Sequence, residues 1–288
     1  MITHIKDTNT DSCIIFIHGL GGGVETFHKF SVYLNRKWDL DFGILCNYFS
    51  YYKYLIASTL WSKIPGNLLL PFKAFWSQRN THNVKLLDEY IINHCSHSRN
   101  IILVAHSMGG LIARQHLIEC RKNQVDISRY KMICTYATPH NGSYVADVIS
   151  FLNIIPIIKY LYKFISKNFN YRISPQIGDL CGFSDFIKNL NKDWRDYDMD
   201  RNIKFLRMVA SNDLLVKTGS AKYHNENGEN VFYFYNSHSS IIKPQPNITS
   251  FPPIDQLIKR LKLLEFEEEY FEELDEEITY EDDLQDDF

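Results

Sequence analysis

Short apolar runs separated by longer amphipathic segments recur along the first 264 residues of the chain. Six runs have the length and the polar or glycine flanks of buried strands. They lie at residues 13–17, 42–49, 101–105, 131–137, 203–210 and 231–235. Helical spacing of apolar residues predicts helices at 25–37, 84–95, 111–119 and 254–264. This alternation favours an α/β fold with a mostly parallel sheet of about six strands and helices on both faces.

Two stretches, residues 50–80 and 144–194, interrupt the alternation. The first is rich in aromatic residues, and the second contains an apolar run at 148–165. Both follow the carboxyl end of a predicted strand, where ligands bind in open α/β sheets, so we predict cap or lid insertions. The apolar run is about as long as the shortest membrane-spanning helices. Because Pro156 and two lysines interrupt it, we expect a lid helix that contacts a membrane surface instead.

The predicted strand at 101–105 leads into the segment AHSMGG, residues 105–110, and a helix pattern follows directly. A serine between small residues at a strand-to-helix turn is the sequence form of a nucleophile elbow. Such a turn leaves no room for large side chains two positions before and after the serine, which fits Ala105 and Gly109. An ordinary strand–turn–helix connection would fit the same residues, so the motif alone leaves both interpretations open.

Acyl transfer by Ser107 would need a base and an acid that orients it. After a nucleophile elbow the acid comes next along the chain and the histidine comes last. His238 directly follows the sixth predicted strand, and Asp213 directly follows the fifth. We therefore predict Ser107, Asp213 and His238 as catalytic residues. The alternative for Asp213 is that it only caps its turn, as Asn-Asp pairs often do.

A glycine-rich segment, HGLGGG, follows the first predicted strand at residues 18–23. Glycines let the backbone approach a substrate, so we predict the Leu20 and Met108 N–H groups as the oxyanion hole. Phosphate binding is the alternative for such a loop. It is disfavoured because the segment lacks the GxGxxG spacing and the P-loop lysine.

Composition and charge limit the cellular compartment and the binding partners that we expect for this protein. The six cysteines form no CxxC pair and no secretory signal is visible, so we expect reduced thiols and a cytoplasmic protein, with peripheral membrane contact through the lid. Residues 265–288 hold 14 acidic side chains and no lysine or arginine, whereas the first 264 residues carry a net charge of +11. We predict an acidic tail that is solvated or binds a basic partner or the body itself. Neither a metal nor another cofactor is expected, nor is nucleic acid.

Five segments together resemble the lipase-like α/β-hydrolases, in the branch of serine esterases that includes GPI-inositol-deacylase-like and lecithin:cholesterol-acyltransferase-like proteins. They are FIHGLGGG at 16–23, ILVAHSMGGLIAR at 102–114, YATPHNGS at 136–143, ASNDLLV at 210–216 and SHSSIIKP at 237–244. The resemblance implies an α/β-hydrolase fold, ester hydrolysis and a Ser107–Asp213–His238 triad. It also implies that the TPHNGS segment is a structural loop beside the site and that His140 is not catalytic.

We therefore expect a serine hydrolase acting on lipid-like carboxylic esters through an acyl-enzyme. The same residues would serve a thioesterase or an amidase, because a triad does not reveal its leaving group. A non-catalytic binding module with this fold is the alternative of a different class. The expected domain organisation is a hydrolase domain at 1–264 with its two insertions, followed by the tail at 265–288.

Overall fold

A computed structural model describes residues 2–4, 12–20, 22–37, 44–49, 80–143, 178–223 and 230–264. The chain forms two compact units, Met1–Pro246 and Asn247–Phe288. In the second unit a helix spans 252–264, close to the predicted 254–264. Its start is fixed by the Asp255 carboxylate, which accepts hydrogen bonds from the Ser250 hydroxyl and the Phe251 N–H. The predicted tail at 265–288 lies outside the described residues.

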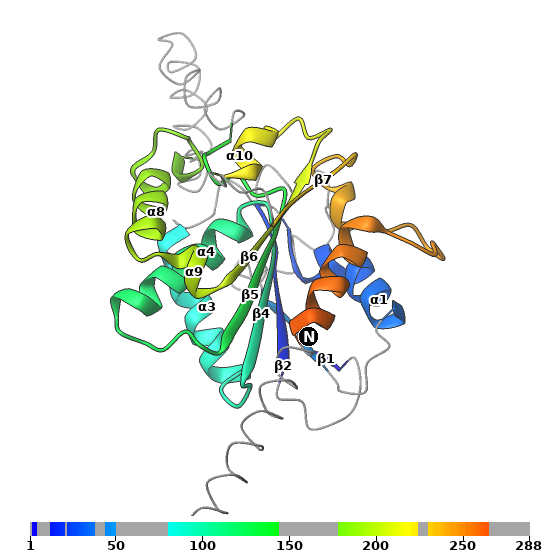
Figure 1. Cartoon of the computed structure of the whole chain (residues 1–288), viewed down its shortest axis with the longest axis horizontal. Coiled ribbons are helices and arrows are strands. Elements are labelled where there is room, and N and C mark those ends of the chain that lie inside the picture. The colour runs from blue at the N-terminus through cyan, green and yellow to red at the C-terminus, as the bar shows by residue number, and fades with distance from the viewer. Residues whose placement is uncertain are drawn as a thin grey trace, which may run out of the picture. The chain divides into compact units, whose positions relative to one another are not determined.

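A seven-stranded sheet forms the centre of the first unit (Figure 1). Its strand order is β1-β3-β2-β4-β5-β6-β7, and every neighbouring pair is parallel except β1 and β3. The strands are β1 (Ile2–His4), β2 (Ser12–Ile17), β3 (Ile44–Phe49), β4 (Asn100–His106), β5 (Tyr130–Tyr136), β6 (Lys204–Ala210) and β7 (Val231–Phe234). All six predicted strands are present. The short antiparallel β1 is an addition that the sequence analysis did not predict.

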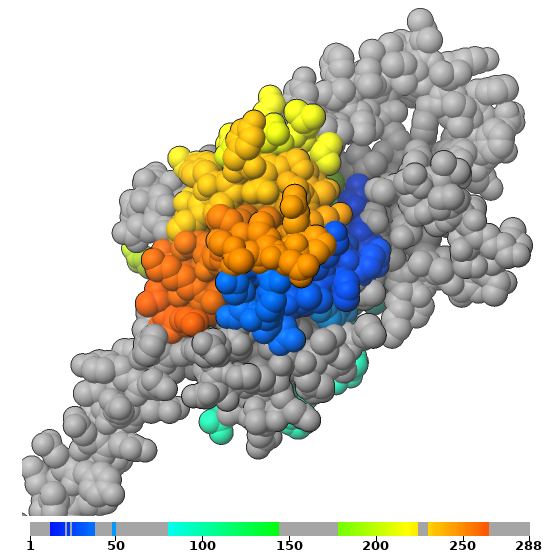
Figure 2. Space-filling view, turned by 90° about the vertical axis from the view of Figure 1, so that its right-hand side faces the viewer, coloured from blue at the N-terminus to red at the C-terminus, as the bar shows by residue number. Residues whose placement is uncertain are grey.

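Helices cover both faces of this sheet (Figure 1). On one face lie α3 (Asn80–His94), α4 (Gly109–Lys122) and α8 (Asp185–Asp196), whose apolar side chains share one core with alternate residues of the strands. On the other face lies α1 (His28–Lys37), preceded by the short η1 (Val24–Phe27). Figure 2 looks onto the face that carries α1 (blue). This alternation confirms the α/β class and explains why the strands are continuous apolar runs.

Aromatic rings make up much of the core beneath α1. Phe16 of β2 stacks on Phe27 of η1 at 5.0 Å between ring centroids and meets Phe30 of α1 edge-on at 5.4 Å. Phe30 in turn meets Tyr136 of β5 at 5.4 Å. Edge-to-face and offset rings at these separations add to the stabilisation that burial alone provides. The carboxyl ends of β2 and β5 are thereby held under one helix.

The two predicted insertions lie largely outside the described residues. Residues 50–79 and 144–177 belong to that part of the chain. The rest of the second insertion, from 178 to 194, contains most of α8, which buries Ile187, Leu190 and Trp194 in the core. This portion therefore packs against the central sheet rather than forming a separate cap. Among the described residues, no helix has both the length and the apolar character needed to cross a membrane.

Candidate active site

Ser107 occupies a tight turn between β4 and α4. Its φ angle is +54°, which is uncommon for a residue other than glycine and indicates a locally strained backbone. Two hydrogen bonds fix this turn. The Ser107 N–H donates to the Tyr136 carbonyl at 2.9 Å, and the Ser107 carbonyl accepts from the Gly110 N–H at 3.1 Å. The local geometry is the strand–turn–helix arrangement of a nucleophile elbow.

Two glycines allow other backbone segments to approach this turn closely. A Cβ at Gly109 would lie 2.4 Å from the Ile17 carbonyl oxygen, so α4 can pack against the end of β2 only without a side chain there. A Cβ at Gly19 would lie 2.6 Å from the Cβ of Ser107. The loop that follows β2 is therefore in direct contact with the elbow.

The structure brings the three predicted residues together from three loops. The Ser107 hydroxyl lies 3.0 Å from His238 Nε2, and His238 Nδ1 lies 2.7 Å from Asp213 Oδ2. Asp213 follows β6 and His238 follows β7, so both come from the carboxyl edge of the sheet, as Ser107 does. The Asp213 side chain is 1% exposed and that of His238 is 14% exposed. Low exposure strengthens these hydrogen bonds because little water competes for them.

The Asp213 carboxylate also caps its own turn, which was the alternative interpretation of this residue. Its Oδ1 accepts hydrogen bonds from the backbone N–H groups of Leu215 at 2.8 Å and Val216 at 3.0 Å, which is the geometry of a turn cap. Because the second oxygen remains directed at His238, the cap and the histidine contact coexist. The turn thus orients the carboxylate toward the imidazole.

The TPHNGS segment contacts the loop that carries Asp213. Ser143 donates a hydrogen bond from its hydroxyl to the Leu215 carbonyl at 2.9 Å. His140 is fully buried, where its two ring nitrogens contact Arg114 at 3.2 Å and Thr135 at 3.1 Å. These contacts are those of a structural residue, in line with the role that the family resemblance implies for this segment.

His106 is a residue of the site that the sequence analysis missed. Its Nε2–H donates to the His238 carbonyl at 2.7 Å, and the two imidazole rings lie 4.8 Å apart. Burial, and secondarily the neighbouring His238, lowers the pKa of His106 to about 3. The ring is therefore neutral at ordinary pH, and its hydrogen bond anchors the loop that carries His238. Its position beside Ser107 in the elbow was the available signal.

The predicted oxyanion donors, Leu20 and Met108, flank this arrangement. Met108 is the first residue after Ser107, and Leu20 follows Gly19, which contacts Ser107. In the described part of the chain, no acceptor binds the N–H group of either residue. Both donors are thus available to another acceptor, and the His18 ring braces the same loop through a 2.8 Å contact with the Gly19 carbonyl.

Acid should destabilise the protein below pH 6.5 because two histidines of this region are buried in the neutral form. Burial lowers the pKa of His106 to about 3 and places that of His140 well below its ordinary value. The unfolded chain takes up these protons as the pH falls below about 6.5, whereas the folded chain does not, so stability present above that pH is lost. Each group should lower the free energy of unfolding by about 1.4 kcal/mol per pH unit.

Denaturant unfolding at pH 7.5, 6 and 5 measures this loss of stability. EDTA is added so that no metal ion contributes to the pH dependence. A His106→Gln variant should show a smaller pH slope, while a His97→Gln variant, changed at an exposed position, should keep the wild-type slope. A free energy of unfolding that stays constant over this range would contradict the prediction.

Comparisons with known proteins identify the family and the fold of the chain. The PGAP1-like alpha/beta domain matches residues 8–176. Protein SERAC1 of Bos taurus is 28% identical over 118 residues, and that of Danio rerio is 29% identical over 119 residues, in each case 39% of this chain. The chain spans only 15% of the length of these relatives.

Two solved structures show the same fold across nearly the whole chain. The mature lipase BlEst2 of Bacillus licheniformis has a TM-score of 0.55 at 16% identity, covering 90% of this chain and 98% of the lipase. A carboxylesterase structure of the Thaumarchaeon Nitrososphaera gargenis has a TM-score of 0.52 at 11% identity, covering 93% and 95%. The predicted α/β-hydrolase fold is thus confirmed. Because the domain match spans more than half of the sequence, the chain belongs to the PGAP1-like alpha/beta domain family.

Proposed function

We propose that this protein is a serine hydrolase that cleaves carboxylic esters with Ser107, His238 and Asp213. The observation that carries the proposal is the continuous hydrogen-bonded chain from the Ser107 hydroxyl through the His238 ring to the Asp213 carboxylate. A serine hydroxyl is a weak nucleophile unless a base within hydrogen-bond reach takes its proton, and His238 Nε2 lies within that reach.

The mechanism follows from the roles that this geometry permits. As Ser107 Oγ attacks the ester carbonyl, His238 Nε2 takes the hydroxyl proton, and Asp213 stabilises the imidazolium through Nδ1–H. The Leu20 and Met108 N–H groups bind the oxyanion of the tetrahedral intermediate. His238 then donates its proton to the leaving alkoxide, which departs as an alcohol and leaves an acyl-enzyme. Water, deprotonated by His238, attacks this ester, and His238 then returns the proton to Ser107 Oγ as it leaves, which releases the acid and free Ser107.

Exposed apolar side chains beside the catalytic loops favour a lipid-like acyl substrate. Leu214, which directly follows Asp213, is 89% exposed, and Tyr235, three residues before His238, is 88% exposed. The two loops are joined by a hydrogen bond from the Asn212 N–H to the Asn236 carbonyl at 3.1 Å. Covering these exposed apolar side chains with an acyl chain or a lipid surface is favourable, because it removes their apolar area from water.

A cytoplasmic location is part of the proposal. Cys13, Cys95, Cys120, Cys134 and Cys181 are buried thiols that form no disulfide within the described residues. Thiols of this kind are typical of proteins in a reducing compartment.

Labelling with a fluorophosphonate probe tests the proposed chemistry. The probe phosphonylates a serine only where a base has activated it, so we expect the folded wild-type protein to be labelled at Ser107, as located by peptide mass spectrometry. Heat-denatured protein and a Ser107→Ala variant should not react. Absence of labelling in the folded protein would favour a non-catalytic binding module.

The preference for apolar substrates can be tested at Leu214. A Leu214→Ser variant should lose about tenfold more kcat/KM on p-nitrophenyl octanoate than on the acetate ester, since only the longer chain can contact this side chain. An Ile92→Ser variant, changed at an exposed apolar residue of α3, serves as the matched control. Equal losses on both esters would contradict a lipid-like acyl preference at this loop.

A further inference from the structure

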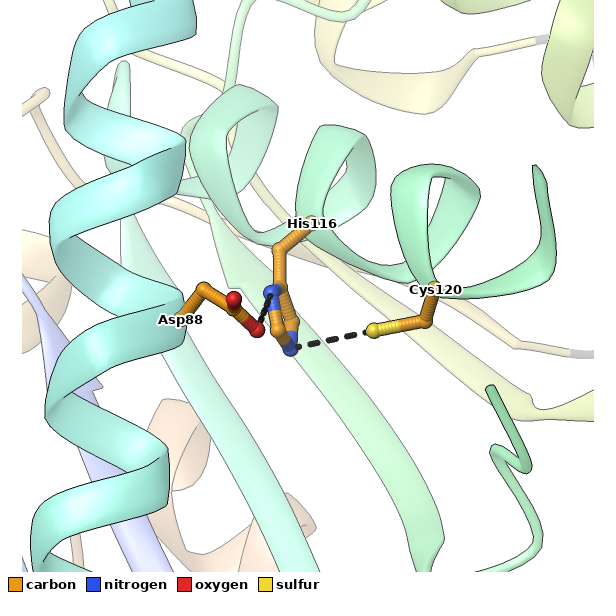
Figure 3. Close-up of side chains that lie close together, drawn as sticks. All are labelled: Asp88, His116 and Cys120. Carbon is orange, nitrogen blue, oxygen red and sulfur yellow. Dashed lines mark hydrogen bonds and ion pairs between the residues drawn. The ribbon is translucent and has the colours of Figure 1, made fainter. Parts of the chain in front are cut away.

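A second group of reactive side chains lies away from the elbow, between α3 and α4. His116 and Cys120 are four residues apart on α4, which places them one above the other on the same helix face. Asp88 of α3 faces them, and Figure 3 shows the three side chains pointing toward one another. One potential ligand atom from each lies within 4.8 Å of the others.

The separations are close to those of metal ligands. Cys120 Sγ lies 3.7 Å from His116 Nε2, and a thiolate and an imidazole on one tetrahedral Zn²⁺ would be about 3.5 Å apart. Asp88 Oδ1 lies 3.8 Å from His116 Nδ1. Because the Asp88 side chain is 54% exposed, it can rotate toward the nitrogen beside Cys120 without disturbing the core.

The three side chains line a cavity of about 530 Å³ that can admit an ion and its water. Asp88, Glu89 and Glu119 bring three carboxylates to its wall, and Lys85 is the single cationic side chain among the lining residues described. His116 and Cys120 form the buried side, with 1% and 6% of their surfaces exposed. This combination attracts a cation and offers it soft donors at the bottom of the cavity.

Tyr130 provides an outer hydrogen bond for this cluster. Its hydroxyl lies 2.8 Å from His116 Nε2 and beside the Cys120 thiol. If His116 Nε2 binds a metal, the hydroxyl can donate to the Cys120 sulfur instead. Partners of this kind orient metal ligands and tune their affinity.

A cysteine, a histidine and an aspartate in one cluster could instead form a nucleophilic catalytic site. It is disfavoured here because burial raises the pKa of Cys120 to about 11, so the sulfur is an unreactive thiol. A metal ion overcomes this resistance directly, since binding to sulfur releases the thiol proton to solvent.

We propose that Asp88, His116 and Cys120 bind a divalent transition-metal ion, for which Zn²⁺ best matches the oxygen, nitrogen and sulfur donors, with water completing the coordination. The ion would fasten α3 to α4, the helix that begins two residues after Ser107. The proposal does not depend on the hydrolytic function, and its test uses binding and stability.

Titration of the reduced, chelator-treated full chain with Co²⁺ and Zn²⁺ provides the test. We expect one Co²⁺ per chain with a near-ultraviolet sulfur-to-cobalt charge-transfer band, which Zn²⁺ displaces. Saturating Zn²⁺ should raise the Tm by about 5 °C. Cys120→Ser should abolish the band, and Asp88→Asn should weaken binding at least tenfold. Cys134→Ser, changed at a buried cysteine of β5 that hydrogen-bonds Tyr136, should behave as wild type.

Two results would overturn the proposal. One is the absence of a saturable site and of the charge-transfer band in the wild-type protein, a measurement that requires no variant to fold. The other is a band that survives in Cys120→Ser, which would place the ion at a different cysteine.

Discussion

Replacing Ser107 with alanine is expected to lower kcat/KM for a p-nitrophenyl ester by at least about 10⁴-fold, because the acyl-enzyme can no longer form. His238→Ala should cost about as much, since the Ser107 hydroxyl then has no base at 3.0 Å. Asp213→Asn should cost about 10³- to 10⁴-fold, because its amide would favour the wrong tautomer of the histidine. Steady-state kinetics of the purified variants measure these losses.

Two further measurements make this prediction specific to the hydrogen-bonded chain. The double variant Ser107→Ala with His238→Ala should be no less active than either single variant, because residues that act as one unit have non-additive effects. Ser239→Ala changes an exposed serine next to His238 and should retain wild-type kinetics. Thermal unfolding of each variant shows whether it is folded. A folded Ser107→Ala variant that keeps more than about a tenth of the activity would refute the assigned role.

The elements that the sequence predicted well are those with a strong local pattern. The strand at β4 is an unbroken apolar run because helices cover both of its faces, and its end is marked by the small residues of the elbow. Asp213 and His238 could be located because chain order in this fold restricts where the acid and base must follow a strand. Each of the three residues follows a strand of the parallel sheet, so the positions of the strand ends were enough to predict that they lie together.

Features that depend on tertiary contacts could not be read from the sequence. β1 has three residues and exists through antiparallel pairing with β3, so it carries no periodicity of its own. The position of His106 beside Ser107 indicates that it lies near the site, but its contact with the His238 carbonyl joins residues 132 positions apart and has no local pattern. The cluster around His116 was missed because Asp88 comes from another helix, and neither helix alone has a complete set of ligands.

Gly109, which follows Met108, should also be sensitive to substitution, in both stability and activity. In Gly109→Ala the new Cβ would lie 2.4 Å from the Ile17 carbonyl oxygen and 2.6 Å from that of His18. Both are backbone atoms at the end of β2, which pairs with β4, so α4 must move instead. We expect a loss of about 3 kcal/mol in the free energy of unfolding. A displacement of Ser107 by about 1 Å should also lower kcat by about 10²-fold.

Gly219→Ala is the matched control, because no heavy atom lies within 4 Å of the Cβ it would add and the position is within the short helix α10 (Thr218–Lys222). This variant should be as stable as the wild type or slightly more so, since alanine favours the helix by about 1 kcal/mol over glycine. Denaturant unfolding and ester hydrolysis of the two variants together separate a general effect of added methyl groups from a clash at the elbow. If Gly109→Ala matched Gly219→Ala in both measurements, α4 could shift from β2 without moving Ser107, and close packing at the elbow would not be what positions the nucleophile.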